Sequence, residues 1–122
     1  MSEEIIYQDC NNMFSITLLY EVEGYYTYEV GVATLGFSGK CNFCISQNMR
    51  IECLKQVEFS LESLSGTVKL SDCDSDAYLE MYFADSMNFY VSGQSGGSYE
   101  DNSLKFMFKA DQTSLQGLKR NM

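Results

Sequence analysis

The chain has 122 residues, a hydrophobic fraction of 45% and a formal net charge of −9. Its length predicts one domain spanning 1–122, and the hydrophobic fraction argues for a folded globule and against a disordered tail. The negative charge argues against nucleic acid and anionic membranes as partners, because both attract basic surfaces. It favours a basic protein partner, and residues 1–39, which contain no lysine or arginine, strengthen that expectation.

The start of the chain, Met1-Ser-Glu-Glu, lacks the basic region of a signal peptide. No segment approaches the roughly 20 apolar residues of a membrane span. The cysteines are odd in number, which fits free thiols in a reducing compartment better than a disulfide framework. We therefore expect a cytoplasmic protein with five free thiols at Cys10, Cys41, Cys44, Cys53 and Cys73.

Alternation of apolar and polar residues predicts three strands in the first part of the chain. The first runs over 13–22, and the second follows a turn at Glu23-Gly24. Another turn is expected at Phe37–Lys40, before a third strand. The side chains expected on one face of the first strand are Phe14, Ile16, Leu18 and Tyr20, and those of the third are Cys41, Phe43 and Ile45.

The period then changes to that of an amphipathic helix, predicted over 48–64. Its N-cap is Ser46 or Asn48, and Gly66 stands where a left-handed C-terminal cap belongs. The apolar stripe consists of Ile51, Leu54, Val57, Leu61 and Leu64.

Strands resume after Gly66, at 67–70, 78–83, 88–92 and 104–109, and a short final helix begins after an N-cap at Asp111. This order predicts an α+β fold with a mostly antiparallel sheet, as a sandwich or half-barrel of about seven or eight strands.

Histidine is absent from the chain. Its absence removes the Ser-His-Asp and Cys-His nucleophile systems and most catalytic zinc sites, so we expect a non-enzyme without cofactor or metal. The C-x-x-C at Cys41 and Cys44 falls within a strand, where residues three apart face opposite sides. It is interpreted as one core thiol and one surface thiol.

An acidic segment, Asp72-Cys-Asp74-Ser-Asp76, resembles the opening of a calcium-binding EF-hand loop. Ala77 replaces the glycine of that motif and Phe83 replaces its final glutamate. The segment is therefore interpreted as an exposed turn between strands. Three carboxylates on such a turn can dock a lysine or arginine of a partner.

The last third of the chain carries a family resemblance. The segments concerned are Ala77-Tyr-Leu-Glu-Met-Tyr82, Phe89-Tyr-Val-Ser-Gly-Gln-Ser-Gly-Gly97, Leu104-Lys-Phe-Met-Phe108 and Asp111-Gln-Thr-Ser-Leu115. They resemble the WapI-type immunity proteins of bacterial polymorphic toxin systems. The resemblance implies a cytosolic inhibitor that binds and neutralises a cognate toxin.

The expected function is thus neutralisation of a toxin domain through an acidic, tyrosine-bearing surface, as a monomer or homodimer. A basic nuclease domain would be a suitable target, because carboxylates can replace its phosphates. The alternative is a small-ligand module of the β-barrel type, with a pocket between strands. The candidate partner-binding residues are Asp72, Asp74, Asp76, Tyr78, Glu80, Tyr82, Tyr99, Glu100 and Asp101.

Overall fold

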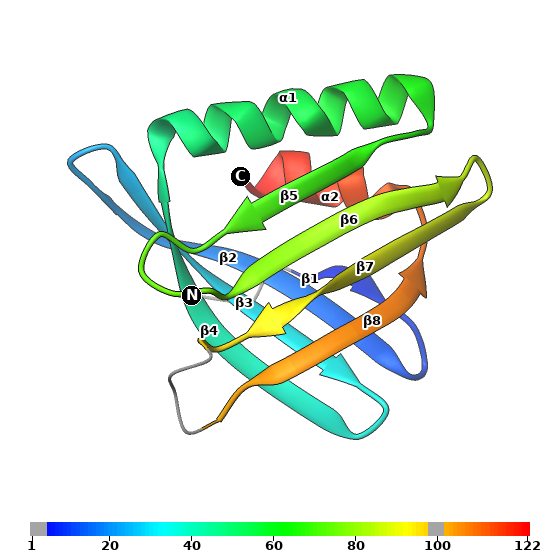
Figure 1. Cartoon of the computed structure of the whole chain (residues 1–122), viewed down its shortest axis with the longest axis horizontal. Coiled ribbons are helices and arrows are strands. Elements are labelled where there is room, and N and C mark those ends of the chain that lie inside the picture. The colour runs from blue at the N-terminus through cyan, green and yellow to red at the C-terminus, as the bar shows by residue number, and fades with distance from the viewer. Residues whose placement is uncertain (1–4, 98–101) are drawn as a thin grey trace.

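The computed structural model describes residues 5–97 and 102–122 and shows an α+β fold with two antiparallel sheets (Figure 1). In each sheet the strands lie side by side in chain order. The first sheet contains β1 (Ile5–Gln8), β2 (Asn12–Val22), β3 (Tyr25–Thr34) and β4 (Phe37–Ser46). The second contains β5 (Thr67–Ser71), β6 (Tyr78–Asp85), β7 (Asn88–Ser95) and β8 (Leu104–Ala110).

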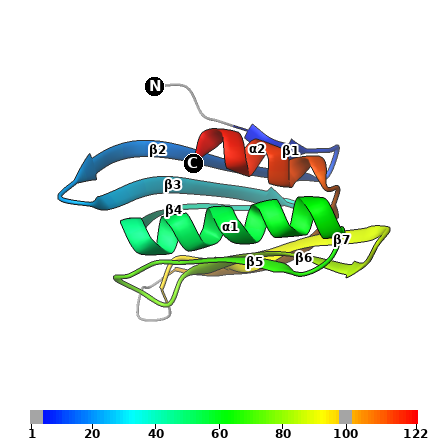
Figure 2. The same ribbon diagram turned by 90° about the horizontal axis from the view of Figure 1, so that it is seen from above.

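The two sheets stack as layers, and α1 (Gln47–Ser63), which connects them, runs along one side of the stack (Figure 2). The second helix, α2 (Thr113–Asn121), packs against β1, β2 and α1. Arg50 of α1 donates from Nε to the carbonyl oxygen of Met122 at 2.8 Å, which ties the two helices together. No helix in the described part of the chain has the length and apolarity needed to cross a membrane.

The core lies between the inner faces of the sheets. Phe14, Tyr28 and Phe43 of the first sheet and Leu79 and Met81 of the second are at most 1% exposed. Because each strand places alternate residues on one face, the period-two pattern of the sequence is sufficient to fill this layer. The sandwich expected from the sequence is confirmed, and it does not close into a barrel.

Strand β1 is absent from the sequence prediction. It has only four residues, too few to show an alternating pattern. Its place is set by tertiary contacts: Tyr7 stacks on Phe108 with ring centroids 5.9 Å apart, and Gly117 of α2 lies against Ile6.

The turn predicted at Phe37–Lys40 is wrong. The chain reverses at Leu35-Gly36, and β4 already begins at Phe37. Both turn residues have positive φ, at 49° and 88°, as a tight hairpin of the primed type requires. Gly39 lies inside β4, where a β-carbon would stand 3.2 Å from Ser95 Oγ, so this glycine permits close packing of the sheets.

Of the two N-cap candidates for α1, Ser46 is the cap, and its Oγ accepts a hydrogen bond from Met49 N at 3.2 Å. The C-terminal prediction is wrong by two residues. Leu64 takes the left-handed cap position at φ 52°, and its N–H donates to Ser60 O. Gly66 also has positive φ but serves the turn into β5, where its carbonyl accepts from Phe83 N.

The apolar stripe predicted for α1 is confirmed in part, since Val57 is buried and Leu54 and Leu61 pack against the core. The fully buried positions are Cys53, Val57 and Ser60, whereas Ile51 is 42% exposed. Helix α1 lies against β5 and α2 rather than over a sheet face. Its buried residues are therefore not simply its most hydrophobic ones.

The cap prediction for α2 is also corrected. The structure places the N-cap at Gln112, which has no side-chain capping bond, and not at Asp111. The Asp111 carboxylate nevertheless accepts a hydrogen bond from Thr113 N at 3.0 Å, so it binds one of the free amides of the first turn.

Candidate binding surface

Three of the predicted contact residues share one face. Tyr78, Glu80 and Tyr82 alternate along β6 and point to the outer side of the second sheet, because their neighbours Leu79 and Met81 are buried. All three are half-buried.

The register shows that this outer face is not acidic. Glu80 stands between Lys69 of β5 and Ser92 of β7, and β8 adds Lys105 and Lys109. Lys69 Nζ lies 3.6 Å from Glu80 Oε1, which neutralises the glutamate. Within the described residues, β5–β8 therefore present three lysines on their outer face against Glu80 and, at the end of β6, Asp85.

The tyrosines on this face mostly contact each other and their neighbours. Tyr82 and Tyr90 stack with ring centroids 5.7 Å apart. The Tyr82 hydroxyl donates to Met107 Sδ at 3.5 Å, and Lys69 lies over the Tyr78 ring at 5.6 Å.

The acidic segment forms the loop between β5 and β6, as predicted, but its first carboxylate has an internal role. Asp72 Oδ1 accepts from Cys44 N at 2.9 Å and from Asp74 N at 3.2 Å, and Oδ2 accepts from Ser75 Oγ at 2.7 Å. Asp72 thus fastens the loop to β4, while Asp74 and Asp76 are exposed. In the described part of the chain, no three acidic or cysteine side chains are grouped to hold a metal ion.

Tyr99, Glu100 and Asp101, the remaining predicted contact residues, lie outside the described residues.

A second tyrosine-bearing surface lies at the β2–β3 hairpin, where a bulge reverses the expected face. The β2–β3 register shifts between Leu18 and Tyr20, so that Tyr20 stands opposite Thr27 instead of Tyr26. The prediction that Tyr20 shares the face of Phe14 and Ile16 is therefore wrong: a bulge moves the following residues to the other side of the sheet.

The bulge places exposed apolar residues around an open depression of about 320 Å³. Tyr20, Val22 and Tyr25 are 55%, 57% and 50% exposed. We call this region the hairpin surface; it consists of Tyr20, Val22, Tyr25, Thr27, Asn42, Cys44 and Asp74.

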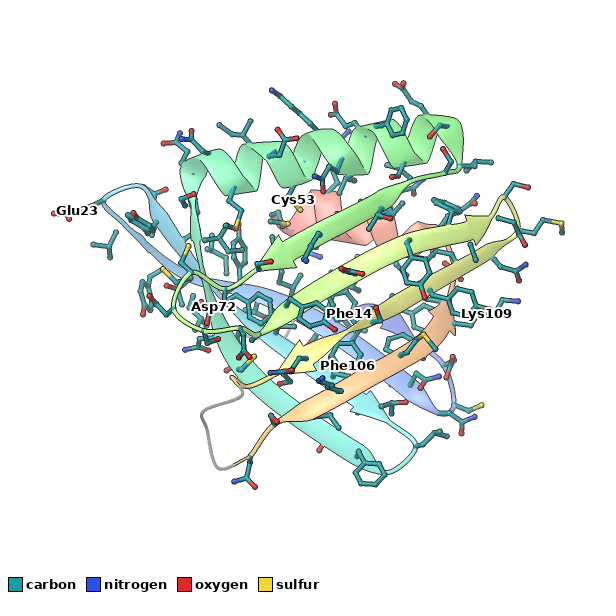
Figure 3. All side chains as sticks on the ribbon, viewed as in Figure 1. Phe14, Glu23, Cys53, Asp72, Phe106 and Lys109 are labelled. Atoms are coloured by element: carbon teal, nitrogen blue, oxygen red, sulfur yellow. The ribbon has the colours of Figure 1, made fainter. Side chains whose placement is uncertain are left out.

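The hairpin surface and its surround carry more acidic than basic side chains. Asp74 lines the surface, and Glu29 stands opposite Asn42 on the same face of the sheet, where Lys40, opposite Gly31, is the neighbouring base. Figure 3 shows Glu23 at the outer tip of the hairpin and Asp72 on the same side of the molecule, whereas Lys109 lies at the opposite side. Among the described residues lining the depression there is no lysine or arginine.

The C-x-x-C cysteines lie as the strand period predicts. Cys41 shares the inner face of β4 with Phe43, and Cys44 points outward into the hairpin surface. All five cysteines are free. Burial, together with the nearby charge of Asp74, raises the pKa of the Cys44 thiol, so this group is held protonated and is a poor nucleophile.

Over residues 5–97 and 102–122, the buried side chains argue against the ligand pocket of the alternative hypothesis. Large side chains, including Tyr28, Phe14 and Phe43, fill the space between the sheets. A hollow of about 450 Å³ is an open surface depression beside the β6–β7 turn and the start of α2.

Sequence reasoning did not bring Tyr20, Val22 and Tyr25 together as one surface, because strict alternation put Tyr20 on the face of Phe14 and Ile16. The only signal available was the pair Leu18-Leu19, which interrupts the alternation. Comparison with known proteins adds no further guide, since neither a family model, nor a curated protein, nor a solved structure matches this chain.

Proposed function

We propose that this chain is a non-catalytic inhibitor, an immunity protein that neutralises a bacterial toxin domain by binding it through the hairpin surface. The observation that supports this most directly is the exposed cluster of Tyr20, Val22 and Tyr25 beside the carboxylates of Asp74 and Glu29. Exposed aromatic residues with a charged surround are typical of protein interfaces.

The proposed mechanism is occlusion guided by charge. Tyr20 and Tyr25 would enter pockets of the toxin, where burial of a tyrosine ring contributes most. Asp74 and Glu29 would face its lysines or arginines. Because residues 1–39 carry acids but no bases, the field on this side also steers a basic partner during approach. A nuclease is the toxin class that fits, since its phosphate-binding site is basic.

The test is calorimetric titration with the toxin domain encoded next to this chain. We expect the Tyr20→Ala/Tyr25→Ala variant to bind at least about thirtyfold more weakly, equivalent to about 2 kcal/mol. Affinity should also fall as salt is raised from about 50 to about 500 mM, because screening weakens charge attraction.

The matched control is Tyr78→Ala/Tyr82→Ala, which removes the same side chains from the other tyrosine face. It should bind as the unmodified chain does. If only this control loses affinity, the toxin binds the second sheet instead. If no toxin binds at any salt concentration, the immunity function is excluded.

A further inference from the structure

Strand β8 forms an edge of the second sheet. Over residues 5–97 and 102–122, its only strand partner is β7, whereas the opposite edge, β5, is covered by α1. Lys69 N of β5 donates to Gln56 Oε1 of α1, so that edge is occupied. Figure 1 shows β8 at the margin of the front sheet, without a helix over it. An edge of this kind presents backbone groups that another strand can bind.

The side chains of β8 indicate which residue types an added strand would need. Lys105, Met107 and Lys109 alternate on its outer face, and Met107 is 64% exposed. Phe106 and Phe108 point inward and are 8% and 6% exposed at the rim of the core. A neighbouring strand would therefore place carboxylates beside the lysines and apolar side chains beside Met107 and the two phenylalanines.

A second copy of this chain is a poor partner for the edge. Antiparallel pairing of two β8 strands about Met107 would put Lys105 of each copy opposite Lys109 of the other. Like charges directly opposite each other destabilise a strand pair. The two lysines thus disfavour self-pairing and favour an acidic segment.

We propose that the β8 edge binds an extended acidic segment of a partner protein by strand addition, with alternate carboxylates on Lys105 and Lys109. An open depression of about 310 Å³ lies at the N-terminal end of β8 and is lined in part by Phe37, Gly39 and Leu104. It can bind an apolar side chain of the same segment. This site is independent of the hairpin surface, so each can fail without the other.

The probe is a fluorescent peptide with the core Glu-Val-Leu-Val-Glu, whose palindromic pattern fits either strand direction. We expect saturable binding by fluorescence anisotropy. Lys105→Glu/Lys109→Glu should weaken it about tenfold or more, because two attractive cross-strand pairs become repulsive. The control Lys55→Glu/Arg120→Glu makes the same change in net charge at exposed positions on α1 and α2 and should bind as the unmodified chain does.

Backbone pairing is tested with two further peptides. One is N-methylated on the odd-numbered amides and the other on the even-numbered amides, and these are the two phases. Because every second amide of an added strand points to the edge, one phase should abolish binding and the other should retain it. Equal binding by both phases would overturn strand addition. Stronger binding of a single-stranded oligothymidylate to the same lysines, or a dimer that the peptide does not displace, would overturn the acidic segment as occupant.

Discussion

A tyrosine–carboxylate pair organises the turn between β1 and β2. Tyr7 donates its hydroxyl to Asp9 Oδ2 at 2.7 Å, while Asp9 Oδ1 accepts from the amides of Asn11 and Asn12 at 2.8 Å each. The hydrogen bond to Asp9 raises the pKa of Tyr7 to about 12, and the bonds from Tyr7 and Asn11 lower the pKa of Asp9 to about 2. The Tyr7–Asp9 hydrogen bond therefore makes the stability of the fold depend on pH in both the acidic and the alkaline range.

We predict that this pair stabilises the fold between about pH 4 and pH 10. The folded pKa of Asp9 lies below its unfolded value, so its contribution is lost as pH falls from about 4 towards 2. The folded pKa of Tyr7 lies above its unfolded value, so its contribution is lost as pH rises from about 10 to 12. In the Asp9→Asn variant, the melting temperature should fall less steeply with pH, both in the acidic window (about pH 4 to 2) and in the alkaline window (about pH 10 to 12). Melting temperatures are measured by circular dichroism.

The control is Asp85→Asn. Hydrogen bonds from Asn88 and Met87 lower the pKa of Asp85, and among the described residues no tyrosine hydrogen bond contributes to that shift. This variant should therefore change only the acidic window. If Asp9→Asn leaves the alkaline window as steep as before, the Tyr7–Asp9 bond is not what stabilises the fold there.

At the scale of elements, the start of α1 gives a direct test of a cap. Ser46→Ala removes the acceptor for Met49 N and should lower the free energy of unfolding by about 1 kcal/mol in urea titration. Asn48→Ala, one residue inside the first turn and exposed, should change it by no more than a few tenths. Equal losses in the two variants would contradict the assignment of Ser46 as the cap.

At the scale of the whole molecule, Cys53 reports on the packing of the helices. It is 1% exposed, its Sγ lies 3.9 Å from Met122 Sδ, and burial raises its pKa to about 12. A thiol in this position reacts only when the fold opens.

We predict that iodoacetamide modifies the exposed Cys10 and Cys73 quickly and Cys53 only at the rate of unfolding. Peptide mass spectrometry over a urea series should show labelling of Cys53 following the global unfolding transition. Native-state labelling of Cys53 as fast as that of Cys73 would show that α1 opens independently of the sheets.

Much of the fold follows from local pattern. The period of two in β2, β3, β6 and β8 and the change of period at α1 are properties of neighbouring residues, so they predict the α+β class and the sandwich. The same alternation places Tyr78, Glu80 and Tyr82 on one face and Cys41 and Cys44 on opposite faces, before any contact is known.

What only the tertiary structure decided concerns residues distant in the chain. The lysines that share the outer face with Glu80 come from β5 and β8, and strand register brings them onto one face, with Lys69 directly beside Glu80. The internal bonds of Asp72 depend on β4, and a one-residue bulge turns Tyr20 outward. Local sequence determines which strands form and which side chains alternate along them. Pairing between strands determines the charge of each surface, because it decides which side chains become neighbours.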